Sequence, residues 1–326
     1  MKVCIYGAGA IGGWIGLRLA NAGCDVSVVA RGATLEVIRD NGLALTHAQT
    51  GQVDSARVRV SNSPAELGVQ DLVVVAVKAP AMADVAKAIA PLLGATTIVL
   101  TAMNGVPWWF FEGFGGKYEG TRLKAVDADG SIAANVPGEH IVGCVVHASC
   151  SLDGAGRVRQ HVGNKLIIGE PSGQKTARVR DLAALLERAG FEAVLSEQIQ
   201  QDTWFKLWGN MTMNPISAMT GATTDLVLDD DLVRGFIGKV MLEAKEIGAR
   251  IGIPIAQEPE DRHAVTRKLG AFKTSMLQDV EKGKPVELDA LVTVVRELGQ
   301  ITEVPTPYTD VLLGLSRLHA KVHKLY

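Results

Sequence analysis

Apolar residues follow two different patterns along the chain. In the first part, short apolar runs alternate with helical patterns, and residues 72–77 (LVVVAV) are apolar at every position. Such a run is typical of a strand buried on both faces of a parallel sheet. After Ser196 the strand patterns stop, and the periodicity predicts only helices, over residues 202–226, 232–251, 258–282, 287–299 and 307–325.

The first part predicts an α/β arrangement. Helices are expected after the first strand through Ala22, and over residues 80–93 and 174–190. A hairpin-like excursion is expected where residues 43–45 and 58–60 flank a polar turn. The other strands are predicted at residues 2–6, 25–30, 72–77, 97–102, 131–133, 141–148, 156–161, 165–169 and 192–195. We therefore expect an N-terminal Rossmann-type dinucleotide-binding domain over residues 1–197 and an all-helical C-terminal domain over residues 198–326.

The helix predicted from residue 202 carries an unusual polar stripe. Lys206, Asn210 and Asn214 recur at every fourth position, so they drift by only about 80° around the helix and share one face. Pro215 follows, and it is expected to interrupt the helix because it removes a backbone donor. A solvated stripe is the simpler interpretation. The strongly apolar flanks favour a helix that is packed on its other faces and turns this stripe towards a cleft.

Composition and charge exclude several functional classes. The chain has 326 residues, 47% of them hydrophobic, with a net charge of −2. This balance gives no indication of binding to nucleic acid or to an anionic membrane. No signal-peptide pattern or membrane-spanning run is present. The four cysteines have no CxxC spacing and are expected to be reduced, as in a cytoplasmic protein. His319 and His323 lack companion ligands, so no metal site is expected.

The most specific motif lies at the N-terminus. An apolar strand over residues 2–6 runs directly into a G-x-G-x-x-G sequence that opens an apolar helix, which is the context of a dinucleotide-binding fingerprint. The first glycine permits the tight turn, the second lets the backbone approach a pyrophosphate, and the third allows close packing of helix and strand. The phosphates would lie against the helix N-terminus. The predicted contacts are Gly7, Ala8, Gly9, Ala10, Ile11 and Gly12.

The end of the second predicted strand indicates which dinucleotide is bound. Enzymes selective for NAD place an acidic residue about 20 residues beyond the glycines to hold the ribose hydroxyl. Here Arg31 occupies that region and no carboxylate is present. A guanidinium matches a 2′-phosphate, so the cofactor is predicted to be NADP(H). An Arg that is merely exposed at a strand end is the alternative.

Two further polar residues follow neighbouring predicted strands. Lys78 ends the run at residues 72–77, and Asn104 follows the strand at residues 97–102. Ligands of open parallel sheets bind beyond the carboxyl ends of the strands, so both side chains are candidate site residues. Four aromatic residues at positions 108–111 come next, and they could wall a pocket or pack in the core.

The helical part contains a second polar cluster. Residues 273–279 (KTSMLQD) place hydroxyl groups near the start of a helix, and residues 283–289 (GKPVELD) form a turn that opens another. Glu287 and Asp289 could simply be acids that favour a helix N-terminus.

These motifs together resemble the ketopantoate reductase (2-dehydropantoate 2-reductase) family. The resemblance is collinear over nearly the whole chain and rests on GAGAIG, Lys78, the Asn104-Gly105 pair, KLWGNMTMNP, and SMLQD followed by VELD. It implies NADPH-dependent reduction of 2-dehydropantoate to pantoate, a step towards pantothenate and coenzyme A.

The resemblance also implies roles for individual residues. Lys206 corresponds to the general acid, and Glu287 to a glutamate near the nicotinamide and the active site. The implied substrate ligands are Asn210, Asn214 and Ser275. The implied cofactor contacts are the glycine motif, Arg31, Lys78, Asn104 and Ala148.

Two positions depart from the family pattern near the substrate. Thr224 stands where the family has an asparagine, and Phe272 where it has a polar residue. A different 2-oxo acid is therefore the alternative substrate. A non-catalytic NADP(H) sensor is a third interpretation, which the presence of Lys206 and Glu287 opposes. The expected partner is a small-molecule 2-oxo acid, and a homodimer is a possible assembly that the sequence does not decide.

Overall fold

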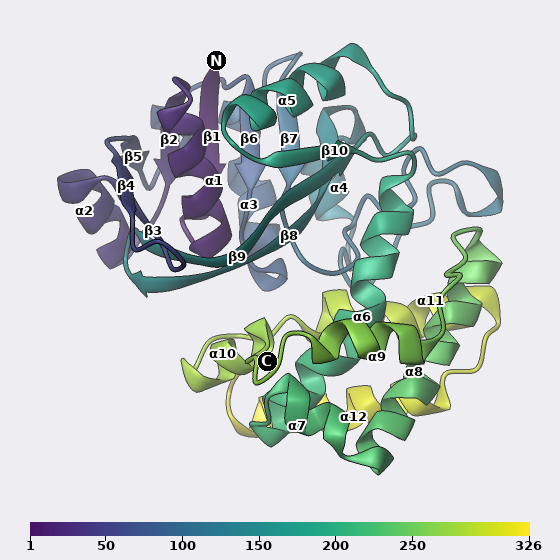
Figure 1. Cartoon of the computed structure of the whole chain (residues 1–326). Helices are drawn as coiled ribbons and strands as arrows, with labels where there is room; N and C mark the ends of the chain where they lie inside the picture. Colours follow the sequence, from purple (N-terminus) through teal and green to yellow (C-terminus); the bar gives the residue numbers. More distant parts are fainter. The chain divides into compact units, whose positions relative to one another are not determined.

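The computed structural model describes all residues from 1 to 326 (Figure 1). Its strands are β1 (Lys2–Tyr6), β2 (Asp25–Val29), β3 (Leu43–His47), β4 (Val53–Ala56), β5 (Arg59–Ser61), β6 (Leu72–Val75), β7 (Ile98–Thr101), β8 (Ile141–Gly154), β9 (Arg157–Gly169) and β10 (Glu192–Leu195). Its α-helices are α1 (Ala10–Asn21), α2 (Gly32–Asn41), α3 (Met82–Ala88), α4 (Ser131–Asn135), α5 (Ala177–Arg188), α6 (Ile199–Thr220), α7 (Thr224–Asp229), α8 (Asp231–Ile251), α9 (Pro259–Arg267), α10 (Ser275–Glu281), α11 (Val294–Thr302) and α12 (Pro307–Val322).

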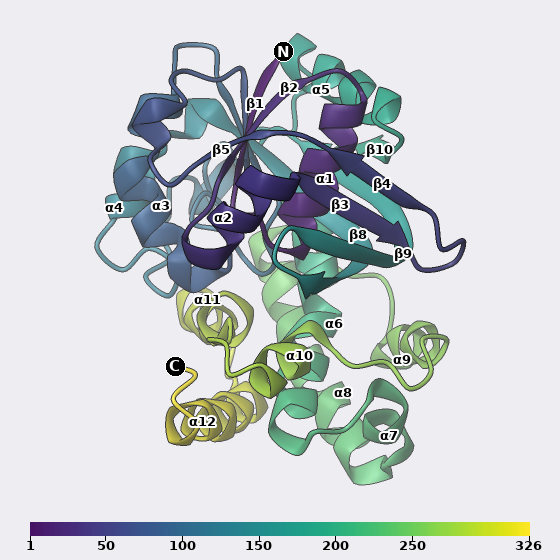
Figure 2. The same ribbon diagram turned by 90° about the vertical axis from the view of Figure 1, so that its left-hand side faces the viewer.

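The strands form one ten-stranded mixed sheet with the order β4-β3-β9-β8-β7-β6-β1-β2-β5, and β10 pairs with β9. Strands β2, β1, β6 and β7 are parallel neighbours, and β8 and β9 form a long antiparallel pair. Figures 1 and 2 show α1 and α5 on one face of these parallel strands, and α3 and α4 on the other. This arrangement explains why β6 and β7 are buried at every position, and it confirms the α/β class.

Two compact units divide the chain. One comprises Met1–Met103, Trp109–Thr121 and Gly130–Ile199, and it contains the whole sheet. The other comprises Asn104–Trp108, Arg122–Asp129 and Gln200–Tyr326, and it contains α6 from Gln200 onward and every later helix. We call them the sheet unit and the helical unit. No helix in either unit combines the length and apolarity that a membrane crossing requires.

The structure corrects two predictions in the sheet unit. Residues 131–133 were predicted as a strand, but they lie in α4, whose helix follows Gly130 in a left-handed conformation (φ 79°). The hairpin exists, but β3 pairs with β4 rather than with residues 58–60. Those residues contribute instead to β5, which joins the parallel edge beside β2. A short run of alternating residues does not specify which neighbour it pairs with.

Helix α6 begins earlier than predicted and runs through the proline that was expected to interrupt it. It begins at Ile199 and continues through Pro215 to Thr220, so the expected interruption at the proline is wrong. Residues 211–218 are all buried. We infer that packing on every side offsets the backbone hydrogen bond that the proline removes.

Two predicted helices are each divided in the helical unit. Residues 202–226 are split by a break after Thr220, and α7 starts at Thr224. Residues 258–282 are split because α9 ends at Arg267 and α10 begins only after Thr274, whose side chain caps it by accepting a hydrogen bond from the Leu277 amide. The apolar periodicity continues across both breaks, so the sequence pattern did not predict them. At the second break, Gly270 has φ 62°, a left-handed conformation that permits the chain to change direction.

Candidate active site

The glycine motif forms a tight cradle between β1 and α1 in the sheet unit. Gly7 has φ 105°, which L side chains rarely adopt. A Cβ at Gly12 would lie 2.0 Å from the Gly7 carbonyl oxygen, so a larger residue cannot occupy this position. Around Gly9, by contrast, nothing lies within 4 Å of an added Cβ. The first and third glycines thus build the turn, and the second leaves open space above it.

The start of α1 is suited to an anionic group. Gly9 is the N-cap residue, no side chain caps the helix, and its first turn holds no acidic residue. The unsatisfied amides and the positive end of the helix dipole therefore remain available. Ala8, Ala10 and Ile11 complete this segment with small or apolar side chains. The cradle consequently fits the pyrophosphate of a dinucleotide.

Arg31 lies just beyond β2, at the N-cap position of α2, and it is exposed. Its guanidinium is close to Tyr6, the last residue of β1. Burial raises the pKa of the Tyr6 hydroxyl, and the positive charge of Arg31 opposes this shift. An exposed cation thus lies near the carboxyl ends of β1 and β2, where a bound nucleotide would carry its ribose.

Lys78 and Ala148 also belong to the sheet unit. Lys78 is exposed and begins the turn that follows β6. Ala148 lies in β8, partly buried against the core of the sheet unit. Asn104, which follows β7, belongs to the helical unit.

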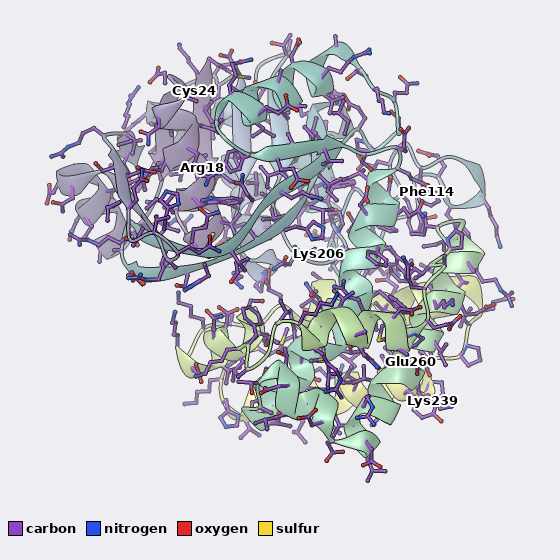
Figure 3. All side chains as sticks on the ribbon, viewed as in Figure 1. Arg18, Cys24, Phe114, Lys206, Lys239 and Glu260 are labelled. Atoms are coloured by element: carbon purple, nitrogen blue, oxygen red, sulfur yellow. The ribbon has the colours of Figure 1, made fainter.

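A hydrogen bond in the helical unit joins two predicted site residues. The Lys206 ammonium donates a hydrogen bond to Asn104 Oδ1 across 2.8 Å, although 102 residues separate them in sequence. Lys206 projects from α6 (Figure 3) and is half-buried. The bond fixes the direction of a cationic proton donor on an otherwise packed helix.

The segment around Asn104 is anchored by a π-helical turn over Asp289–Thr293. The Val106 amide donates to the Ala290 carbonyl at 2.9 Å. A Cβ at Gly105, where φ is 84°, would lie 2.4 Å from that carbonyl oxygen, so only glycine fits. Such π-turns are frequent at functional sites.

Glu287 lies just before this π-helical turn and is only 5% exposed. The C-terminus of the chain holds its neighbours on both sides. The Val286 amide donates to the Leu325 carbonyl at 3.0 Å. The Tyr326 hydroxyl donates to Asp289 Oδ1 at 2.8 Å. A buried carboxylate is thereby fixed on a segment that also carries the anchor for Asn104.

The three predicted substrate ligands differ in exposure. Asn210 is half-buried on α6, and Asn214, one turn further on, is 6% exposed. Ser275 is exposed as the first residue of α10. The polar stripe is therefore not a fully solvated surface, because Lys206 and Asn210 are half-buried and Asn214 is buried.

The two positions that depart from the family pattern contact each other. The Thr224 amide donates to the Phe272 carbonyl at 3.0 Å. The Thr224 hydroxyl donates to the Gly270 carbonyl at 2.8 Å. Together these bonds attach the loop between α9 and α10 to the start of α7.

All four aromatic residues at positions 108–111 are buried, so they pack in the core rather than form the wall of an open pocket. Trp109 Nε1 donates to the Thr101 hydroxyl at 3.2 Å inside the sheet unit. No group of three or more His, Cys, Asp or Glu side chains is placed to hold a metal ion.

Sequence reasoning missed three features of these sites. They are the proximity of Tyr6 to Arg31, the π-helical turn, and the contacts of the C-terminal residues. Only the first had a signal in the sequence, since Tyr6 directly precedes the glycine motif.

This fold and these sites define the class of protein as the two-domain, dinucleotide-dependent reductases. The family model for "Ketopantoate reductase PanE/ApbA" matches residues 3–173, and that for its C-terminal part matches residues 198–320. The chain therefore belongs to the ketopantoate reductase family.

Individual relatives agree over the full length. The chain is 45% identical to a 2-dehydropantoate 2-reductase of Mesorhizobium japonicum, covering 97% of each chain. A crystal structure from Ralstonia solanacearum, provisionally described as a ketopantoate reductase, is 55% identical with a TM-score of 0.96, covering 100% of this chain and 99% of that one. A ketopantoate reductase structure from Ralstonia eutropha has 26% identity and a TM-score of 0.85, covering 99% and 100%.

Proposed function

We propose that this protein reduces 2-dehydropantoate to pantoate with NADPH, a step of pantothenate and coenzyme A biosynthesis. The observation that carries the proposal is the 2.8 Å bond between the Lys206 ammonium and Asn104 Oδ1. It holds a proton donor in a fixed direction on a helix that also bears two carboxamides. Membership of the family supplies the substrate.

NADP(H) binding is proposed for the sheet unit. The cradle of Gly7, Gly9 and Gly12 and the open N-terminus of α1 suit a pyrophosphate. Arg31 would pair with a 2′-phosphate, and its exposure leaves the guanidinium accessible. The remaining proposed contacts are Ala8, Ala10, Ile11, Lys78 and Ala148 in the sheet unit, and Asn104 in the helical unit. When bound, this cofactor supplies the hydride.

Lys206 is proposed as the general acid. Reduction of a ketone places negative charge on its oxygen, which an ammonium group both stabilises and protonates. The hydrogen bond to Asn104 orients Nζ, and the amine regains its proton from solvent after the reaction.

Glu287 is proposed as a second catalytic residue. Its carboxylate would help to keep the amine protonated. Its burial makes its charge effective over a longer range than in water.

The substrate is proposed to bind through the helical unit. Asn210 and Asn214 would hold its hydroxyl and carbonyl groups, and Ser275 its carboxylate. The chain is accordingly proposed to comprise two domains, a NADP(H)-binding domain over residues 1–197 and a helical substrate domain over residues 198–326. A cytoplasmic location is also proposed, which suits four cysteines that form no disulfide.

A reductase of a different 2-oxo acid is the second candidate. The observation that favours it is the linkage of Thr224 to Phe272, because both positions depart from the family pattern and together they fix the loop before Ser275.

Consumption of NADPH with a panel of 2-oxo acids tests the proposal. Ketopantoate is expected to give the highest kcat/KM. A higher value for another 2-oxo acid would favour the second candidate. NADPH binding without turnover of any 2-oxo acid would indicate a sensor and would contradict both enzymatic functions.

A further inference from the structure

Arg262 on α9 is a cation without a counter-ion. Its side chain is half-buried, and Nε is buried without a hydrogen-bond partner. Burial lowers the pKa of the guanidinium, and no neighbouring charge contributes to this shift. A buried charge is costly unless a partner of opposite charge offsets the lost hydration. The site is therefore suited to an anion that comes from outside the chain.

Helix α6 makes room for this guanidinium at Gly209. A Cβ at Gly209 would lie 2.6 Å from Arg262 Nε and 2.9 Å from Nη2, so a larger residue would displace the side chain. The ring of Phe205, one turn earlier on α6, lies 5.5 Å from the central carbon of the guanidinium. Glycine costs a helix interior about 1 kcal/mol relative to alanine. The helix thus gives up stability at a position where a side chain would exclude the cation.

The guanidinium lies beside the proposed proton donor. Gly209 and Asn210 are the third and fourth residues after Lys206, so both are its neighbours on the surface of α6. At 100° per residue they lie about 60° and 40° from Lys206 in opposite directions. Arg262 therefore flanks Lys206 on the Gly209 side, and Asn210 flanks it on the other. All four residues belong to the helical unit.

A 2-oxo acid presents two adjacent groups that match this arrangement. Its ketone oxygen is the atom that Lys206 is proposed to protonate, and its carboxylate is bonded directly to the ketone carbon. A carboxylate is a bidentate partner for a guanidinium, which supplies both charge and direction. Ser275 offers the same carboxylate a hydroxyl group, which carries no charge. The substrate itself would thus be the missing counter-ion of Arg262.

We propose that Arg262 binds the carboxylate of the 2-oxo acid and is a specificity-determining residue of the enzyme. The inference rests on the proposed reductase function and adds a residue to it. Lys206 protonates the ketone oxygen, and Arg262 fixes the other end of the same small molecule.

Steady-state kinetics with the best 2-oxo acid of the panel test this role. Arg262→Gln should raise KM by about tenfold to a hundredfold, as for loss of a hydrogen bond to a charged group. The value of kcat should change less, because the proton donor is retained. Arg262→Lys should recover part of the loss, since it keeps the charge but not the planar fork. Arg250→Gln is the matched control, because Arg250 is exposed on α8 and already pairs with Glu246.

Two further measurements separate recognition from packing. Arg262→Gln should keep or raise the melting temperature without substrate, because it removes an unpaired charge. Gly209→Ala should raise KM in the wild-type background, since its methyl group displaces the guanidinium. The same change should add little to KM in the Arg262→Gln background, because both act through one side chain.

Two results would overturn the inference. One is a normal KM of Arg262→Gln for every 2-oxo acid that the wild type reduces; a lower melting temperature in that variant would then assign Arg262 to packing. The other is an effect of Gly209→Ala on KM that persists in full in the Arg262→Gln background, which would assign the effect to α6 itself.

Failure of the proposed function gives a different result. If the wild type reduces no 2-oxo acid, calorimetric titration with oxamate, an unreactive 2-oxo carboxylate, decides the inference. Binding that Arg262→Gln weakens at least about tenfold would support the carboxylate site even without turnover. Absence of such a difference would overturn it.

Discussion

The Lys206 ammonium bonds Asn104 Oδ1 at 2.8 Å, and this single contact connects α6 with the segment that follows β7. Asn104 is in turn fixed through Gly105 and Val106, which pack on Ala290 in the π-helical turn. The proposed general acid and the segment bearing Glu287 are therefore parts of one hydrogen-bonded assembly in the helical unit.

Replacement of the proposed general acid should abolish most turnover. A positioned acid contributes about 10²–10⁴-fold, so Lys206→Ala should lower kcat by about that factor at saturating NADPH. NADPH affinity should be unchanged, because its proposed phosphate contacts lie in the sheet unit. Lys239→Ala, an exposed lysine on α8, is the control. A Lys206→Ala kcat within a few-fold of wild type would remove Lys206 from the mechanism.

Removal of Arg31 should change cofactor preference. The proposed pair with the 2′-phosphate has no counterpart in NADH, so Arg31→Ala should weaken NADPH binding by ~1.5–3 kcal/mol and leave NADH nearly unaffected. Titration of both cofactors measures this difference. Arg39→Ala, in the last turn of the same helix, should alter neither. Equal losses for NADPH and NADH in Arg31→Ala would contradict the assignment.

Two alanine substitutions in the glycine motif should separate folding from binding. Gly12→Ala places a Cβ 2.0 Å from the Gly7 carbonyl, so thermal unfolding should show a loss of at least ~1–3 kcal/mol. Gly9→Ala meets nothing in the protein, so its stability should stay within ~0.5 kcal/mol of wild type. Its NADPH affinity should nevertheless fall at least about tenfold, because the methyl group occupies the space proposed for the pyrophosphate. A Gly9→Ala variant with normal affinity would place the phosphates elsewhere.

The carboxamides of α6 should affect substrate rather than cofactor. Asn210→Ala and Asn214→Ala each remove a proposed substrate hydrogen bond, so KM for the 2-oxo acid should rise by about tenfold or more. The Kd for NADPH should be unchanged. Because Asn214 is buried, the melting temperature is measured in parallel. Lower stability with normal kinetics in both variants would make the stripe purely structural.

Alkaline pH should weaken the C-terminal anchor. Burial, followed by the hydrogen bond to Asp289, raises the pKa of Tyr326 from 10.0 to about 12. The folded state thus holds this proton more tightly than the unfolded state, so its stabilisation is complete below pH 10 and disappears between about pH 10 and 12. The difference in unfolding free energy between wild type and Tyr326→Phe should shrink over that interval. A difference independent of pH would mean that the hydroxyl proton does not stabilise the fold.

Some errors of the sequence-based prediction have a common origin. Residues 131–133 and the segment from 258 to 282 were assigned from local patterns, yet their conformations depend on Gly130 and on the Thr274 cap. The continuation of α6 through Pro215 depends on the burial of the surrounding residues, which a local rule about proline does not include.

The sequence by itself determined what short-range physics controls. The glycine spacing after β1 specified the turn and the cradle, and the periodicity of α6 placed Lys206, Asn210 and Asn214 on one face. Unbroken apolar runs specified the buried parallel strands. These features depend on residues within a few positions of one another, so they can be read from the chain.

Only the tertiary structure decided which distant segments meet. It assigned Asn104–Trp108 to the helical unit, bonded Asn104 to Lys206, linked Thr224 to Phe272, and attached the C-terminus beside Glu287. Such contacts join residues tens to hundreds of positions apart. They arise because packing must satisfy buried polar groups wherever the chain brings them together, and no local pattern encodes the partner.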